Sequence, residues 1–235
     1  NDYTFDVIQK NISLNDKITF VDTTFIEQFS DRIKRLACAR QKLKNYLVDT
    51  NINPKFVCVV DLDDVLNKNF NKDLIDNLSK ILEKGNDKYF GISLNSEPYY
   101  YDILNFESNE FPNKKIKQLQ NNKSLKSYNQ RKKYIYNVQK SLTEKKFFDC
   151  ISGFNGLCIY AYKDFIQSDY LEKSDDPTPE HLYLNRKLNY KTGKKILVTE
   201  NCLQMPQEHK PLDNIFLFIM EKLYKYIAIY LRKFK

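Results

Sequence analysis

Three aspartates directly follow a short apolar run, and their spacing suits metal-ion chemistry. The run Phe56–Val60 (FVCVV) has the length and β-branched content of a buried strand. It is followed by Asp61, Asp63 and Asp64. Ligands of open α/β sheets bind beyond the carboxyl ends of the strands, and carboxylate oxygens suit Mg²⁺ or Mn²⁺. The pattern predicts that Asp61 and Asp63 hold a divalent cation that neutralises phosphate charge. A solvated turn or a helix N-cap is the alternative.

Two further groups of residues could contribute to a site. Gly153 and Gly156 are two of only five glycines, and they suit either close approach of the backbone to a ligand or a tight turn. Glu180 follows a Pro-containing loop at an expected helix start, where backbone N–H groups stabilise an acid. An acid at this position is either a general base or a helix acid without chemical function.

The elements that must position these residues alternate between strands and helices. An amphipathic helix is expected from Ser30, and another at 70–82 that ends at Gly85. Strands are expected at 56–60, 89–94 and 195–203 and around the turn at 153–156, with helices at 134–142 and after Pro179. The basic stretch Lys114–Lys133 predicts a solvated loop or an acceptor-binding flap. This order predicts one α/β domain with a parallel or mixed sheet.

Taken in order, these segments resemble the DxD-containing glycosyltransferases of the GT-A fold, and in particular a viral and microbial subset of them. The resemblance runs from roughly Arg32 to His209 and implies a GT-A-like domain over residues 1–212, with a Rossmann-like mixed sheet flanked by helices. Residues 1–24 offer no opening strand with a nucleotide-binding loop, so this unit is expected to be incomplete. The segments that carry the resemblance are RIKRLACARQKLKNYL, FVCVVDLDD, EPYYYDIL, SGFNGLCIY, PEHLYLNRKL and KILVTENCLQ.

The resemblance implies roles in binding a metal and a nucleotide. Asp61 and Asp63 match the ligands of a Mn²⁺ or Mg²⁺ ion and its nucleotide, and His209 matches a third metal ligand; a surface histidine is the alternative for His209. Arg32 and Arg40 share a broad helix face. They match guanidinium groups that connect the nucleotide site to the aspartates, with ordinary surface ion pairs as the alternative.

The resemblance also implies roles in binding the sugar and in catalysis. Gly153, Asn155 and Gly156 match the strand that approaches the donor sugar. Asp64 matches a hydrogen-bond acceptor for that sugar, or it caps the next helix. Glu180 matches the base of an inverting enzyme. The implied function is transfer of a sugar from a nucleotide-diphosphate sugar to a hydroxyl of a glycan, protein or lipid-linked acceptor.

Two other functions are compatible with parts of the sequence. Haloacid-dehalogenase-like phosphatases also end a strand in DxD and would use Asp61 as nucleophile, but Asp64 occupies their usual Gly position. A net charge of +8 and a pI near 9.0 suit an anionic partner. The segment KSYNQRKKYIY resembles a nucleic-acid-binding surface but leaves the aspartates unexplained, so no nucleic-acid partner is expected.

The last 23 residues, 213–235, predict an amphipathic helix with a basic face. Charged residues interrupt its apolar run, which makes it a poor membrane span. It could lie in an anionic membrane interface, or pack on the domain or on a dimer partner. The five cysteines show no metal-binding spacing and predict free thiols in a reducing compartment. A cytoplasmic protein is therefore expected (in the host cytoplasm if viral), with peripheral membrane contact as an addition.

Overall fold

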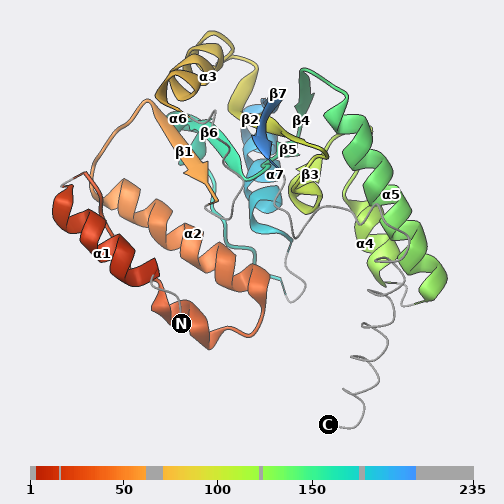
Figure 1. Cartoon of the computed structure of the whole chain (residues 1–235), viewed down its shortest axis with the longest axis horizontal. Coiled ribbons are helices and arrows are strands. Elements are labelled where there is room, and N and C mark those ends of the chain that lie inside the picture. Colours follow the sequence, from red (N-terminus) through yellow and green to blue (C-terminus); the bar gives the residue numbers. More distant parts are fainter. Residues whose placement is uncertain (1–3, 16, 62–70, 122–123, 175–177, 205–235) are drawn as a thin grey trace.

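A five-stranded mixed sheet with helices on both of its faces forms the centre of the molecule (Figure 1). The computed structural model describes residues 4–15, 17–61, 71–121, 124–174 and 178–204. The general class is therefore the α/β class that the sequence predicts. Among the described residues, none of the helices is both long and apolar enough to cross a membrane.

The order of strands in the sheet is β1-β6-β2-β7-β4. β6 runs antiparallel to both β1 and β2, so these two strands are parallel to each other, and β7 is parallel to β2. The carboxyl ends of β1, β2 and β7 therefore lie at one edge of the sheet, beside the start of β6. The strands are β1 (Phe56–Val60), β2 (Tyr89–Glu97), β4 (Phe148–Cys150), β6 (Leu157–Ala161) and β7 (Lys195–Gln204).

Three helical segments precede the sheet: α1 (Thr4–Leu14), the 3₁₀ helix η1 (Thr24–Gln28) and α2 (Arg32–Asp49). The side chain of Asp31 caps α2 by accepting a hydrogen bond from the backbone N–H of Lys34. The predicted cap, Ser30, is one residue too early, because an Asp at the next position can accept the same bond. The described part of this region contains no strand, in agreement with the polar sequence.

The sheet separates two hydrophobic clusters. α3 (Lys72–Lys84) covers one face through Leu78 and Leu82, which pack with Leu157 and Ile159 of β6. α2, α5 (Leu125–Thr143) and α7 (Glu180–Thr192) supply residues to the cluster on the other face. The strict alternation along β6 explains this division, since successive side chains of a strand point to opposite faces.

The basic stretch predicted as a loop is helical, and this prediction was wrong. Lys114–Asn121 forms α4 and Leu125–Thr143 forms α5, which begins well before the predicted residue 134. Ser124 caps α5, and the Ser127 hydroxyl donates to the Leu119 carbonyl at 2.8 Å, which joins the two helices. Buried Ile116 and Val138 anchor them to the core. Tertiary packing of a few apolar residues thus outweighs the high local charge.

Short elements complete the fold. The 3₁₀ helix η2 (Ile103–Asn105) leads into β3 (Phe106–Glu107), which pairs antiparallel with β5 (Ser152–Gly153). α6 (Tyr162–Phe165) follows β6. A Cβ atom on Gly153 would lie 2.6 Å from the sulfur of Cys150 and 3.0 Å from a methyl of Val198. The absent side chain therefore permits close packing of β5 on the main sheet.

Candidate active site

The polar groups of the candidate site converge at the carboxyl edge of the sheet. Asp61 follows the last residue of β1, and Asp102 lies in the connection after β2. The Asp61 backbone N–H donates to the Gly156 carbonyl at 2.8 Å, and Gly156 has a φ of 86°, a conformation that favours glycine. The predicted turn at 153–156 thus fixes the position of Asp61 through the backbone.

Arg40, in the middle of α2, connects two carboxylates that are far apart in the sequence. Its Nη2 lies 2.5 Å from Oδ1 of Asp61, and its Nη1 donates to Oε1 of Glu180, the first residue of α7. The Arg40 side chain is 15% exposed and that of Glu180 only 4%. The guanidinium also lies 5.5 Å from the centre of the Phe154 ring, within cation–π range. Arg40 is therefore well placed to organise this edge of the sheet.

Asp102 is a third carboxylate at this edge, and the sequence analysis did not identify it. Its side chain accepts a hydrogen bond of 2.7 Å from the Asn105 amide, and its backbone N–H donates to the Asn155 side chain at 2.8 Å. Burial raises the pKa of Asp102 to about 6, and the negative charge of Asp61 adds to this shift, while the Asn105 hydrogen bonds and Arg40 oppose it. The pattern that could have indicated Asp102 is an acid after three tyrosines in EPYYYDIL, beyond the end of an expected strand.

Asn155 holds the loop that carries Asp102. Its amide donates to the Leu94 carbonyl at 3.1 Å and to the Ser96 hydroxyl at 2.9 Å, while its oxygen accepts from Asp102. Asn155 is completely buried, and Gly153 and Gly156 are also buried. In this structure these three residues support the site from the protein interior and do not line its surface.

An aromatic stack supports Arg40 from the protein side. The His181 ring lies parallel to that of Phe154 at 3.5 Å, and the Tyr170 ring meets His181 edge-on at 5.4 Å. Burial, with a smaller contribution from the charge of Arg40, lowers the pKa of His181 well below its usual value. Neither ring nitrogen has a hydrogen-bond partner in the described part of the structure. His181 is thus a neutral packing group that stacks on Phe154, the ring beside the guanidinium.

A cavity of about 330 Å³ lies between α2 and the connection from α6 to α7. Lys34 and Cys38 line it from α2, and Tyr170 and Thr178 line it from the connection. Because Tyr170 also contacts His181, the cavity adjoins the stack beneath Arg40. Its volume falls within the range of small-molecule sites.

Of the remaining predicted site residues, Arg32 lies within the described part of the structure, and it is not part of this cluster. Arg32 is exposed at the first residue of α2, eight positions before Arg40. Asp63, Asp64 and His209 lie outside the described residues, as does the predicted helix at 213–235. Within the described ranges, no group of three or more His, Cys, Asp or Glu side chains could hold a metal ion. Asp61, 25% exposed, is the described member of the predicted metal set and supplies the hard oxygen donors that Mg²⁺ or Mn²⁺ requires.

The raised pKa of Asp102 predicts how stability changes with pH. The folded protein holds this proton more tightly than the unfolded chain, so the free energy of unfolding should fall as pH rises from about 4 to about 6, and this contribution should then stay constant. Asp102→Asn removes the buried charge and should raise the free energy of unfolding at pH 7 by about 1–3 kcal/mol. Urea unfolding of both proteins at pH 4 and pH 7 checks this, with no difference expected at pH 4. A loss of stability at pH 7 would contradict it.

Comparison of the chain with protein-family models, with curated proteins and with solved structures finds no match.

Proposed function

We propose that the protein is a metal-dependent glycosyltransferase of GT-A type that moves a sugar from a nucleotide-diphosphate sugar to an acceptor hydroxyl. The observation that carries the proposal is the meeting of Asp61, Asp102, Glu180 and Arg40 at the carboxyl edge of a mixed α/β sheet. Ligands of open α/β sheets bind at this edge. The order of motifs from the Arg-containing helix to the closing strand adds independent support.

A sugar transfer of this kind requires a metal ion, a group that binds phosphate and space for a ligand, and residues at this edge could supply each of them. A Mg²⁺ or Mn²⁺ ion, when bound, supplies positive charge for the leaving diphosphate. Asp61 would hold that ion together with Asp63 and His209. Arg40 offers a guanidinium, which suits phosphate oxygens, and the adjoining cavity is large enough for a small ligand.

In the proposed reaction the acceptor oxygen forms a bond to the sugar, the bond between the sugar and the diphosphate breaks, and the acceptor hydroxyl loses its proton. Two carboxylates of the described structure could accept this proton. Glu180 is paired with Arg40 and is almost fully buried. Asp102 is less buried, and with a pKa of about 6 it is mostly ionised and basic enough to accept a proton near neutral pH. Asp102 therefore joins Glu180 as a candidate base.

A thermal-shift screen tests the proposal. Wild-type protein is melted with UDP-, GDP- and dTDP-sugars, each with and without Mn²⁺. A donor present at about 100 times its Kd stabilises the folded state by about 2.7 kcal/mol, which raises Tm by roughly 5–10 °C for a chain of this size. A shift is expected with one class of donor and only with Mn²⁺. No shift with any donor, together with release of phosphate from a phosphomonoester, would contradict it in favour of the phosphatase.

A further inference from the structure

The positive charge of this protein is concentrated on one helical hairpin. Residues 114–143 contain nine Lys or Arg and no Asp or Glu, whereas the whole chain has a net charge of +8. The rest of the chain therefore has a net charge of −1 (8 minus 9). Surfaces that serve only solubility mix charges of both signs, and like charges close together on a helix destabilise it. This segregation indicates a surface that meets an anionic partner.

Exposed lysines recur at a regular spacing along one side of α5. Lys126, Lys133 and Lys140 are spaced by seven residues, so they lie on one side of the helix, about 10 Å apart along its axis. All three are exposed, and none has an ion-pair partner within the described ranges. Asn129, Gln130 and Asn137, also exposed, lie between them. We call this set of six residues the α5 lysine face.

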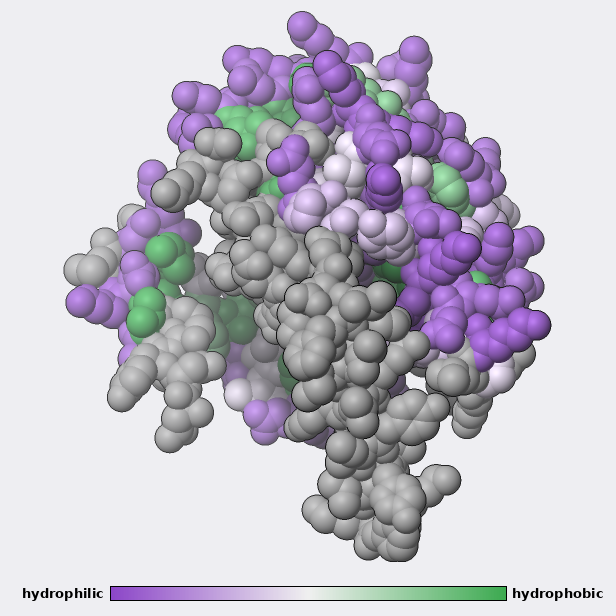
Figure 2. All heavy atoms as spheres, turned by 45° about the vertical axis from the view of Figure 1, so that its right-hand side comes forward, coloured by the Kyte–Doolittle hydropathy of each residue, from purple (hydrophilic) through white to green (hydrophobic). Residues whose placement is uncertain are grey.

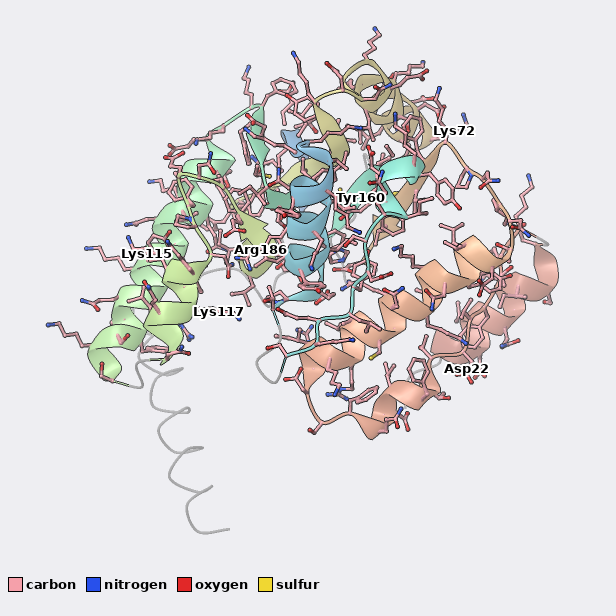
Figure 3. All side chains as sticks on the ribbon, turned by 180° about the vertical axis from the view of Figure 1, so that it is seen from behind. Asp22, Lys72, Lys115, Lys117, Tyr160 and Arg186 are labelled. Carbon is pink, nitrogen blue, oxygen red and sulfur yellow. The ribbon has the colours of Figure 1, made fainter. Side chains whose placement is uncertain are left out.

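α4 extends the cationic surface. Lys114 and Lys115 are exposed on α4, and Figure 3 shows Lys115 and Lys117 on this helix, at the opposite side of the molecule from Lys72 of α3. The view in Figure 2 brings the side with α4 and α5 forward, and its right-hand part is a broad hydrophilic area. α4 thus adds exposed lysines next to those of α5, since the two helices pack against each other.

Two of the three tyrosines of the hairpin are engaged by its own cations, and the third, Tyr136, packs against Tyr99. Arg131 and Lys132 lie 5.6 and 5.4 Å from the centre of the Tyr128 ring, and Lys115 lies 4.5 Å from that of Tyr134. Proteins that bind single-stranded nucleic acid instead stack bases on available aromatic rings. The hairpin therefore offers a partner mainly the charge of its lysines.

We propose that the α5 lysine face and the adjoining lysines of α4 bind the surface of an anionic lipid membrane. Clusters of four to eight basic residues bind such surfaces electrostatically, and the compact charge of lysine needs no specific geometry. Tyr136, at 38%, is the only exposed large hydrophobic residue among the described side chains of α4 and α5. The protein therefore adsorbs to the headgroups without inserting into the acyl chains.

The test uses the full chain and sedimentation with vesicles. Wild-type protein should pellet with phosphatidylcholine vesicles that contain about 30% phosphatidylserine, and not with pure phosphatidylcholine. Raising the salt concentration from about 0.05 to about 0.3 M should release it. The triple variant Lys126→Gln, Lys133→Gln, Lys140→Gln should partition roughly 100-fold more weakly, since each lysine near the surface contributes about fivefold.

A matched control removes the same charge elsewhere. Lys72, Lys80 and Lys84 are exposed on α3, and Figure 3 shows Lys72 at the opposite side of the molecule from α4. Their replacement by Gln should change partitioning by less than about threefold, because salt screens charges that are far from the membrane. Replacing the three α5 lysines by Arg keeps the charge and should preserve binding. Equal loss in both Gln triples, or none in the α5 triple, overturns the proposal. So does tight binding of an oligonucleotide without binding to anionic vesicles.

Discussion

Replacing Asp61 with Asn is expected to lower sugar transfer by at least about 100-fold while the fold is retained. The change removes one negative charge from the residue that follows β1 and leaves a side chain of nearly the same shape. A metal ion supplies several kcal/mol of charge stabilisation in a transition state, and about 1.4 kcal/mol corresponds to a factor of ten in rate. Initial rates at saturating donor and Mn²⁺ measure the effect.

An exposed carboxylate provides the control for this experiment. Asp76 of α3 pairs with Lys72 at 2.5 Å and is 46% exposed, so Asp76→Asn makes the same chemical change far from the site. Its rate should stay within about twofold of wild type, because exposed ion pairs contribute little. Near-normal turnover of Asp61→Asn with Mn²⁺ present would remove this residue from metal binding.

Arg40→Met is expected to lower the free energy of unfolding by about 3–5 kcal/mol, the typical cost of removing one partner of a buried ion pair. The variant leaves the carboxylate of Glu180, which is 4% exposed, without its guanidinium. It also removes the cation that lies over Phe154. Urea unfolding at pH 7 measures the change from the shift in midpoint at an unchanged m-value.

Two further variants separate the ion pair from general damage. Arg40→Met combined with Glu180→Gln removes both charges of the pair and should recover part of the lost stability. Arg186→Met breaks a more exposed pair with Glu107 and should cost clearly less. A loss below about 1 kcal/mol in Arg40→Met, or no recovery in the double variant, would contradict this account of Arg40.

The strands and several helices of the fold could be predicted because their sequence signals are local. The apolar run 56–60 corresponds to β1 residue for residue, and the helix expected after Pro179 begins at Glu180. The strand expected at 195–203 ends one residue later, at Gln204. In each case a short apolar or amphipathic pattern is bounded by a residue that favours a break or a cap.

The helical hairpin and part of the site could not be predicted, because they depend on contacts between distant segments. α4 and α5 are held by Ile116 and Val138, which are isolated among charged and amide residues. The ion pair of Arg40 with Glu180 joins residues 140 positions apart, and no local pattern indicates which arginine of α2 turns toward the sheet. Asp102 was missed because its pKa depends on burial and on the charge of Asp61.

The balance of charge at the carboxyl edge has a consequence for the order in which ligands bind. Arg40 pairs with Asp61 and Glu180, and Asp102 interacts with the charges of Asp61 and Arg40. These four groups formally carry two negative charges when all three carboxylates are ionised. A diphosphate arriving alone would be repelled, since like charges disfavour each other at short range. For the proposed reaction, kinetics should therefore show a compulsory sequence in which the divalent cation binds before the donor or together with it, and the nucleotide product leaves before the cation.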